Sequence, residues 1–384
     1  MKKALFITTV SGFLYQFELS NVKILQDMGY EVHYAANANN PGYEIDESVK
    51  AESGVIFHHV DISKSPKDFL KHQKAKNELE KLVKSLDTDL IHCHTPMGGV
   101  LGRLVGRSCG RGRPKVMYTT HGFHFYNGAP GYYRTFYMIE KKLAEYTDAI
   151  ITINREDYRH AKAFRMRPGG KVYKINGEGL DTEEYTLEKK RKRRLAMRQK
   201  LGLKDDDFFV LSVGELCANK NHETVINAVA SIRDKRVKYG ICGMGDLSDA
   251  LKLQVQKKGV SDRVFLYGYC TDTEDYLYAA DAFAFPSRRE GLGMAAIEAL
   301  ASGLPCIAAD NRGTREYMKP GINGFISEYN DVAGFARGIL KLQNMTDEQK
   351  EKMEKNCIKS AKKFDIKNVR PAMQKIYEEM DRRI

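Results

Sequence analysis

The 384-residue chain has few prolines, no closely paired cysteines and no long apolar stretch, and each of these absences excludes a class of protein. It contains only 10 prolines, so long proline-rich linkers are absent. Its seven cysteines are scattered, odd in number and never spaced as C-x-x-C, so we expect neither a disulfide scaffold nor a structural zinc site, and a reducing compartment fits best. No stretch reaches the ~18–20 apolar residues of a membrane-spanning helix. What remains is an ordinary globular composition, with 42% hydrophobic and 29% charged residues.

The N-terminal residues 1–7 superficially resemble a secretory signal, with two lysines before an apolar run. The residues at 14–18, Leu-Tyr-Gln-Phe-Glu, are bulky and polar where a small-residue cleavage site would be needed. We therefore expect a first β-strand that ends at Ser11-Gly12, in a cytoplasmic protein.

Positive charge is in excess, since 62 Lys and Arg residues against 50 Asp and Glu residues give a formal net charge of +12 at pH 7. This excess indicates an anionic partner, which could be a phosphate ligand, nucleic acid or an anionic membrane. The densest basic run, at 189–194, is accompanied by no nucleic-acid recognition motif. A solvated helix face is the usual explanation for such a run, so we expect no nucleic-acid partner.

Short apolar runs alternate with segments of helical periodicity, and this alternating series occurs in two successive parts of the chain. This alternation predicts parallel strands joined by crossover helices, in two α/β units of similar size. A break near 176–181 separates the units. The expected strands are 4–8, 31–35, 55–60, 90–93, 116–120 and 149–153 before the break, and 208–213, 237–242, 264–267, 282–285 and 305–309 after it. The expected helices are 18–28, 67–86, 187–203, 221–232 and 294–301, with a charged helical stretch from 347 to the end.

The most specific pattern is a strand, a loop and a helix at 286–299, which reads PSRREGLGMAAIEA. Gly291 and Gly293 would let a ligand approach the backbone, and the N-terminus of the following helix attracts phosphate. Glu290 and Glu298 can both face one ligand, and a carboxylate can accept bonds from two sugar hydroxyls. Spacing alone leaves an ordinary strand-to-helix turn with a solvated glutamate as the alternative.

Glu290-x7-Glu298, followed by ASGLPCIA at 301–308, resembles the signature of the family 4 retaining glycosyltransferases. The segments IHCHTP at 91–96, YTTHGFHF at 118–125 and 147–154 are similar to a subgroup acting in capsule and exopolysaccharide assembly. The resemblance implies the α/β GT-B fold, with two Rossmann-like domains facing each other across a cleft. We expect an acceptor-binding domain at 1–178, a nucleotide-sugar domain at 179–364, and a final helix at 365–384 that could cross back to the first domain.

The resemblance also implies roles for individual residues. Glu298 would bind the ribose, Glu290 the transferred sugar, and Lys220 the leaving phosphate, where an ammonium stabilises charge that grows in the transition state. His121, after the run 116–120, would contact the transferred sugar and help to position the acceptor. The catalytic candidates are thus His121, Glu290 and Lys220. The donor-binding candidates are Gly12, Gly243, Gly245, Tyr269, Arg289, Gly291, Leu292, Gly293, Met294 and Glu298.

Several of these residues could instead have a purely structural or solvated role. Lys220 could be a solvated lysine before a helix, His121 a buried histidine satisfied by the backbone, and Gly12 a plain turn. His92 and His94, two residues apart on a strand, could suggest a metal. No aspartate or cysteine completes a ligand set for them and the family is generally metal-independent, so we expect a structural role and no metal or other cofactor.

One departure from the family pattern concerns Glu215, at a position where many members carry an arginine. A carboxylate beside a diphosphate is unfavourable unless it turns away or pairs. Arg288 or Arg289 could supply the missing positive charge, and a solvated role for both is the alternative.

The resemblance therefore implies a retaining, hexosyltransferase-type enzyme that moves a sugar from a nucleotide-diphosphate donor, which we expect to be a UDP-sugar, to a lipid-linked sugar in polysaccharide assembly. A GT-B nucleotide-sugar 2-epimerase and a non-catalytic nucleotide-sugar binder are the alternatives. The chain also predicts peripheral binding to an anionic membrane. The basic residues of the expected membrane surface are Lys67, Lys71, Lys74, Lys76, Lys81, Lys84, Arg103, Arg107, Arg111, Arg113 and Lys115, with Tyr132, Tyr133, Phe136 and Tyr137 nearby. A solvated helix face with core aromatics is the alternative.

Overall fold

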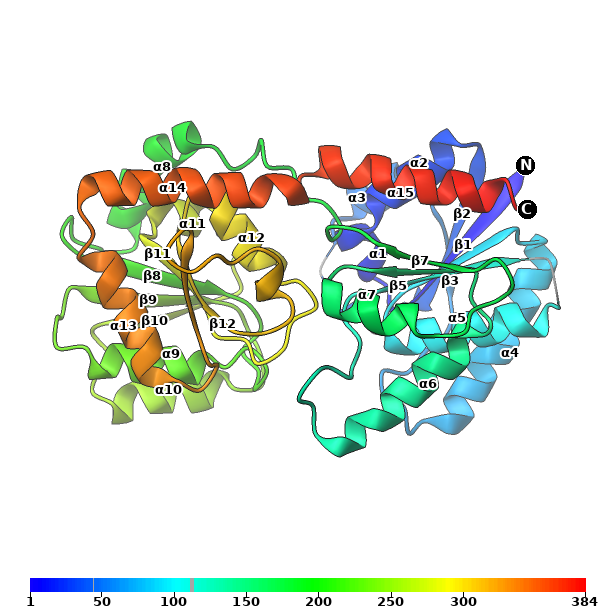
Figure 1. The fold of residues 1–384 in the computed structure, drawn as a ribbon, viewed down its shortest axis with the longest axis horizontal. Coiled ribbons are helices and arrows are strands. Elements are labelled where there is room, and N and C mark those ends of the chain that lie inside the picture. Colours follow the sequence, from blue (N-terminus) through cyan, green and yellow to red (C-terminus); the bar gives the residue numbers. More distant parts are fainter. Residues whose placement is uncertain (44, 111–113) are drawn as a thin grey trace. The chain divides into compact units, whose positions relative to one another are not determined.

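A computed structural model describes residues 1–43, 45–110 and 114–384. The chain divides into two compact units (Figure 1). Unit 1 comprises Met1–Gly179 and Lys367–Ile384, and unit 2 comprises Leu180–Ile366. The polypeptide thus leaves unit 1 after residue 179 and returns to it at residue 367.

Unit 1 is built on a parallel seven-stranded sheet in the order β3-β2-β1-β4-β5-β6-β7. The order reverses between β1 and β4, which pair with each other from Ala4↔Leu90 to Ile7↔Cys93. In parallel α/β sheets, ligands bind beyond the carboxyl ends of the strands at such a reversal. The strands are β1 (Lys2–Val10), β2 (Tyr30–Asn37), β3 (Ile56–His59), β4 (Leu90–Cys93), β5 (Lys115–Thr120), β6 (Ala149–Thr152) and β7 (Lys171–Lys174).

The helices of unit 1 present apolar or glycine-rich faces to this sheet. Helix α5 approaches strand β4 closely at Gly102, where an added Cβ would lie only 2.7 Å from the Cβ of Cys93. The absence of a side chain at Gly102 therefore permits this approach. The core includes Leu5, Ile7 and Ile91 from the central strands. The helices are α1 (Phe13–Phe17), α2 (Leu19–Asp27), α3 (Glu47–Glu52), α4 (Phe69–Leu86), α5 (Pro96–Ser108), η1 (Gly131–Tyr133), α6 (Arg134–Ala144) and α7 (Arg155–Lys162).

The C-terminal helix α15 (Ile366–Asp381) belongs to unit 1, and both chain termini lie side by side there (Figure 1). Its buried residues Val369, Met373, Ile376, Tyr377 and Met380 recur at helical spacing, so one face of the helix packs on the unit. Asp381 accepts bonds from Lys2 at 2.8 Å and from Tyr30 at 2.5 Å.

Unit 2 repeats the design with a parallel six-stranded sheet in the order β10-β9-β8-β11-β12-β13. Its order reverses between β8 and β11. The strands are β8 (Phe208–Val213), β9 (Val237–Cys242), β10 (Val264–Gly268), β11 (Ala282–Phe285), β12 (Cys306–Ala309) and β13 (Gly324–Ser327). The helices are α8 (Leu187–Lys200), α9 (His222–Ser231), α10 (Ser248–Lys257), α11 (Thr273–Ala279), α12 (Met294–Ala301), η2 (Thr314–Glu316), α13 (Val332–Gln343), α14 (Asp347–Ala361) and η3 (Lys362–Phe364).

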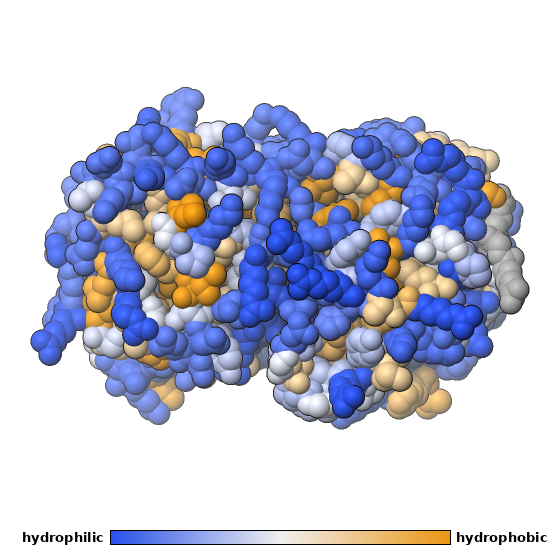
Figure 2. Space-filling model, in the orientation of Figure 1, coloured by the Kyte–Doolittle hydropathy of each residue, from blue (hydrophilic) through white to orange (hydrophobic). Residues whose placement is uncertain are grey.

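On the face drawn in Figure 2, hydrophilic side chains dominate the surface of each unit and apolar ones form small patches. In the described part of the chain, no helix combines the length and the apolar character needed to cross a membrane.

Candidate active site

In unit 2, the loop that joins β11 to α12 carries most of the predicted donor-binding residues. Gly293 is the N-cap of α12 and has φ of 91°, a left-handed conformation that favours glycine. A Cβ at this position would also lie 2.6 Å from the ring of Phe285, so glycine is required for space as well. The loop therefore delivers the N-terminus of α12, with its partial positive charge, to the carboxyl edge of the sheet.

Lys220 and Glu290, predicted from separate motifs, form an ion pair in unit 2. The Nζ atom of Lys220 lies 2.7 Å from Oε1 of Glu290. The two loops are joined at their backbones as well, because Arg288 N–H donates to the carbonyl of Asn219 and the Asn219 side chain donates to the carbonyl of Arg289. A cation and a carboxylate are thus held together beside the N-terminus of α12.

Asn221 helps to hold the Lys220–Glu290 ion pair in place. It has φ of 56° and precedes helix α9. Its side-chain amide donates to the carbonyls of Pro286 and Tyr329 at 3.2 and 2.7 Å. The segment that carries Lys220 is therefore fixed against the segment that leads to Glu290.

Glu298 lies on α12 and is half-buried. Among the described residues, its carboxylate has no hydrogen-bond or ion-pair partner. Burial, assisted by the charge of Glu274, raises its pKa to about 7. The carboxyl oxygens of Glu298 are therefore not engaged by a described protein group.

The other predicted donor-binding residues surround these loops or support them. A Cβ on Gly245 would lie 2.6 Å from the carbonyl oxygen of Leu216, so this glycine lets the segment after β9 pack on the segment after β8. A Cβ on Gly243 would overlap the carbonyl of Gly214. Tyr269 is 55% exposed and Leu292 is buried. Gly291, Met294 and Arg289 are half-buried in the β11–α12 region.

Glu215 is exposed and forms no ion pair with a described residue. Arg312, which follows β12, lies beside the site instead: it is buried, and its Nε donates to the carbonyl of Glu290 at 3.3 Å.

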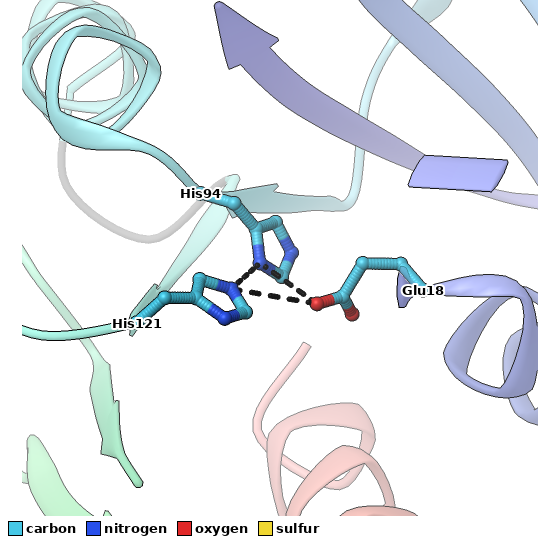
Figure 3. A group of neighbouring side chains, drawn as sticks. All are labelled: Glu18, His94 and His121. Carbon is cyan, nitrogen blue, oxygen red and sulfur yellow. Dashed lines mark hydrogen bonds and ion pairs between the residues drawn. The ribbon is translucent and has the colours of Figure 1, made fainter. Parts of the chain in front are cut away.

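In unit 1, three side chains from separate segments meet beyond the carboxyl ends of β4 and β5 (Figure 3). His94 follows β4, His121 follows β5, and Glu18 lies between α1 and α2. His94 Nδ1 is 3.2 Å from His121 Nε2 and 3.2 Å from Glu18 Oε1, and the latter two atoms are 3.6 Å apart. Gly12 lies nearby in the chain as the N-cap of α1, where a Cβ would be 2.7 Å from the carbonyl oxygen of Tyr43.

A fourth residue, Glu178, completes the surroundings of His121. Its Oε1 lies 2.5 Å from His121 Nδ1. Burial opposes an imidazolium at His121, but the hydrogen bond and charge of Glu178 and the charge of Glu18 outweigh it and raise the pKa of His121. Burial likewise opposes ionisation of Glu178, but the bond from His121 and its charge lower the pKa of Glu178. These opposite shifts describe an ion pair.

The remaining groups of the cluster are harder to ionise. Burial raises the pKa of Glu18 to about 7, although the charge of His121 and a bond from Asn21 act against that rise. Burial and the neighbouring histidines hold the pKa of His94 well below its ordinary value. His92 is bonded to Tyr377 and to Thr119 in the interior, and burial lowers its pKa to about 3.

Glu18, His94 and His121 have the spacing of a three-ligand cation site, since one donor atom from each lies within 4.8 Å of the others. A metal-ligating histidine ordinarily donates its second ring N–H to a carboxylate or carbonyl. His121 has such a partner in Glu178, but Nε2 of His94 is buried and finds no partner in the described part of the chain. The trio therefore fits a hydrogen-bonded cluster better than a metal centre.

Comparison with known proteins identifies the chain. Residues 193–364 match the family described as Glycosyl transferases group 1, and residues 22–181 match Glycosyltransferase Family 4. The relative named "Putative glycosyltransferase EpsD" from Bacillus subtilis (strain 168) is 39% identical over 348 residues, 89% of this chain and 87% of its own. The chain belongs to these glycosyltransferase families.

A more distant relative is an Escherichia coli UDP-Gal:alpha-D-GlcNAc-diphosphoundecaprenol alpha-1,3-galactosyltransferase. It is 29% identical over 75% of this chain and 74% of its own. Among solved structures, Anabaena HepE bound to UDP-glucose has a TM-score of 0.80 at 18% identity, covering 99% of this chain and all of its own. A sucrose-phosphate synthase from Thermosynechococcus elongatus has a TM-score of 0.81 at 20% identity, covering 99% of each chain. The predicted GT-B fold is confirmed.

Sequence reasoning missed three residues of this glycosyltransferase, namely Glu18, Glu178 and Arg312. Glu18 and Glu178 lie 103 and 57 residues from His121 in the sequence, and no local pattern predicts that they contact it. Arg312 follows a predicted strand at its carboxyl end, where α/β sites gather, and that position is the signal that could have found it.

Proposed function

We propose that this glycosyltransferase moves a sugar from a UDP-sugar to an acceptor hydroxyl with retention of the anomeric configuration. The observation that carries the proposal is the Lys220–Glu290 pair at 2.7 Å beside the N-terminus of α12, with the unpartnered Glu298 on the same helix. A cation, helix amides and two carboxylates are the groups that a diphosphate linked to two sugars would need.

Each group would contact a different part of the donor. The amides at the start of α12 and the Lys220 ammonium would hold the diphosphate, and Arg312 would add a second positive charge. Glu298 would accept hydrogen bonds from the ribose hydroxyls, and Glu290 from the hydroxyls of the transferred sugar. The Lys220–Glu290 ion pair would keep both side chains in place before the donor arrives.

In the proposed reaction, the bond between the sugar C1 and the diphosphate oxygen breaks, and a bond from the acceptor oxygen to C1 forms on the same face. The acceptor proton passes to an oxygen of the departing diphosphate, so no protein carboxylate has to act as nucleophile. Lys220 would stabilise the negative charge that grows on the leaving group. This positive charge would replace a divalent cation, and we propose that the enzyme needs none.

We further propose a lipid-linked sugar in polysaccharide assembly as the acceptor. Support comes from the named substrate of the Escherichia coli relative, a GlcNAc-diphosphoundecaprenol. A Campylobacter jejuni relative, 31% identical over 44% of this chain, is likewise named for an undecaprenol-linked substrate.

Such an acceptor requires contact with a membrane, and we propose that unit 1 makes it through the start of helix α4. Phe69 and Leu70 are 77% and 89% exposed there, between the exposed Lys67, Lys71 and Lys74. Apolar side chains flanked by lysines complement an anionic bilayer, with about 1 kcal/mol at best from each basic residue. The enzyme would then act as a peripheral protein on the cytoplasmic face.

The structure corrects part of the membrane surface expected from the sequence. Arg103 is completely buried, pairs with Glu140 at 2.7 Å and stacks on Tyr118, so it cannot meet a bilayer. Tyr133, Phe136 and Tyr137 pack against the core, whereas Tyr132 is 67% exposed. Arg111 and Arg113 lie outside the described residues.

Product analysis tests the proposal against its alternatives. The purified enzyme is incubated with each of several UDP-sugars, with and without an undecaprenyl-diphosphate sugar. A transferase gives a lengthened lipid-linked sugar and free UDP, with slow hydrolysis alone when no acceptor is present. A new UDP-sugar formed without acceptor would show an epimerase, and binding without any product would show a nucleotide-sugar binder.

A further inference from the structure

Both ring nitrogens of His121 are already engaged by protein groups. Nδ1 faces Glu178 Oε1 at 2.5 Å, and Nε2 faces His94 Nδ1 at 3.2 Å and Glu18 Oε1 at 3.6 Å. One imidazole is therefore placed between two carboxylates that approach it from opposite sides of the ring. An imidazolium, which carries a proton on each nitrogen, suits this arrangement.

The carboxylates of Glu18 and Glu178 are buried, so their stability depends on a positive charge on the His121 ring. The side chain of Glu18 is 2% exposed and that of Glu178 is 12% exposed. A buried carboxylate is costly unless it is paired. In the described part of the chain, no Lys or Arg forms an ion pair with either one, so His121 supplies the counter-charge.

Glu178 lies between two glycines in left-handed conformations. Gly177 and Gly179 have φ of 76° and 91°, conformations that favour glycine. This tripeptide ends the first of the two segments that form unit 1, and its carboxylate bonds to His121.

We propose that Glu178 is a positioning residue that fixes the ring of His121 and keeps both its nitrogens protonated, with Glu18 as a second, weaker partner. His121 is then held as a cation and does not act as a general base. This role rests on the proposed transfer reaction and deepens it, because the acceptor proton must then go to the departing diphosphate. The protonation of His121 itself can be measured whether or not that reaction is correct.

The described titratable groups around His121 are Glu178, Glu18, His94 and His92. Glu178 forms the short bond and Glu18 the longer ion pair. His94 is neutral, because burial and the nearby histidines hold its pKa far below the ordinary value. His92 is also neutral at physiological pH, with a pKa of about 3. Glu178 thus dominates the protonation of His121.

The test is an NMR titration of the full chain labelled in its histidine rings, with His121 assigned through the His121→Gln variant. Glu178→Gln preserves an oxygen that can accept from Nδ1 but removes the negative charge. We expect the titration of His121 to lie above pH ~6.5 in the unmodified protein and to move to lower pH in Glu178→Gln. Glu18→Gln should move it in the same direction, but less.

A matched control is available within unit 1. Glu31 Oε1 lies 2.8 Å from His33 Nε2, away from the site. Glu31→Gln should leave the titration of His121 unchanged. An unaltered titration of His121 in folded Glu178→Gln would overturn the proposal, as would a His121 that is neutral at pH 6. Stoichiometric zinc in the purified protein, lost in Glu18→Gln, would also overturn it and assign the cluster to a metal.

Activity gives an independent readout. With a cationic His121, kcat falls at high pH, and Glu178→Gln should move this fall to lower pH, whereas a merely structural role would lower kcat equally at every pH. Failure of every UDP-sugar as donor, with the NMR shifts as expected, would refute the proposed function and leave the His121 assignment standing.

Discussion

Lys220 and Glu290 lie 70 residues apart in sequence, and their side chains form an ion pair of 2.7 Å. They belong to the loops that follow β8 and β11, the neighbouring strands at which the sheet order of unit 2 reverses. Ligands of open α/β sheets bind at this kind of reversal. This position supports the proposal that the donor sugar and its leaving diphosphate bind at the pair.

Replacing Lys220 by alanine should reduce kcat more than it weakens donor binding. The ammonium acts on charge that develops in the transition state, and losing one such group costs on the order of 10²–10³ in rate. Steady-state kinetics with the UDP-sugar measure this. The control is Lys238→Ala, a lysine elsewhere in unit 2, which should match the unmodified enzyme. Full kcat in Lys220→Ala would remove Lys220 from the catalytic residues.

Affinity for UDP should depend on pH through Glu298. Its pKa of about 7 means that the accepting carboxylate form falls to about a tenth at pH 6, so UDP should bind about tenfold more weakly at pH 6 than at pH 8. Glu298→Ala should weaken UDP and UDP-sugar alike by about 1.5–3 kcal/mol. Calorimetry at both pH values is the measurement. Undiminished affinity in the variant would show that Glu298 does not contact the nucleotide.

Glu290→Gln should reduce turnover while sparing the binding of free UDP. This difference follows because Glu290 is assigned to the transferred sugar, which UDP lacks. Comparing UDP with UDP-sugar in the same calorimetric series isolates the sugar contact. An equal loss for both ligands would assign Glu290 to the nucleotide or to the loop structure instead.

No divalent cation should be required for turnover, since Lys220 and the N-terminus of α12 supply positive charge at the diphosphate site. Activity after treatment with EDTA and gel filtration should equal that of the untreated enzyme. Activity that disappears with EDTA and returns with magnesium or manganese would contradict this.

The protein should sediment with anionic vesicles at low salt and much less with neutral ones, and binding should fall as salt rises. Replacing both Phe69 and Leu70 by serine should weaken sedimentation without loss of folding, because both side chains are largely exposed. Serine at Met244, an exposed apolar residue of unit 2, is the matched control. An unmodified protein that stays in the supernatant with anionic vesicles at low salt would end the proposal.

The sequence predicted the central strands because they are short and apolar. It missed the edge strands β7 and β13 and several helices, among them α1, α5, α6, α7, α10, α11 and α13. β7 reads Lys-Val-Tyr-Lys at a sheet edge, where no residue is fully buried. β13 is also an edge strand, and it begins with a glycine. Helix α1 has only five residues, too few to show a helical period.

The site was predictable to the extent that its residues lie in one continuous motif. Glu290, Gly293 and Glu298 belong to a single strand, loop and helix, so their spacing carries information. Glu178 and Glu18 come from distant segments and acquire their meaning only through the fold. The exposure of Glu215 likewise depends on tertiary packing, which the sequence of a single chain does not reveal.

The anomeric configuration of the product shows whether the sugar is transferred from a UDP-sugar with retention. Proton NMR of the newly formed linkage gives this configuration, which is compared with that of the donor. We expect an α-linked product from an α-configured UDP-sugar, together with one equivalent of UDP. A β-linked product would contradict the retaining mechanism, and the absence of any transferred sugar from every UDP-sugar supplied would contradict the assignment of the donor.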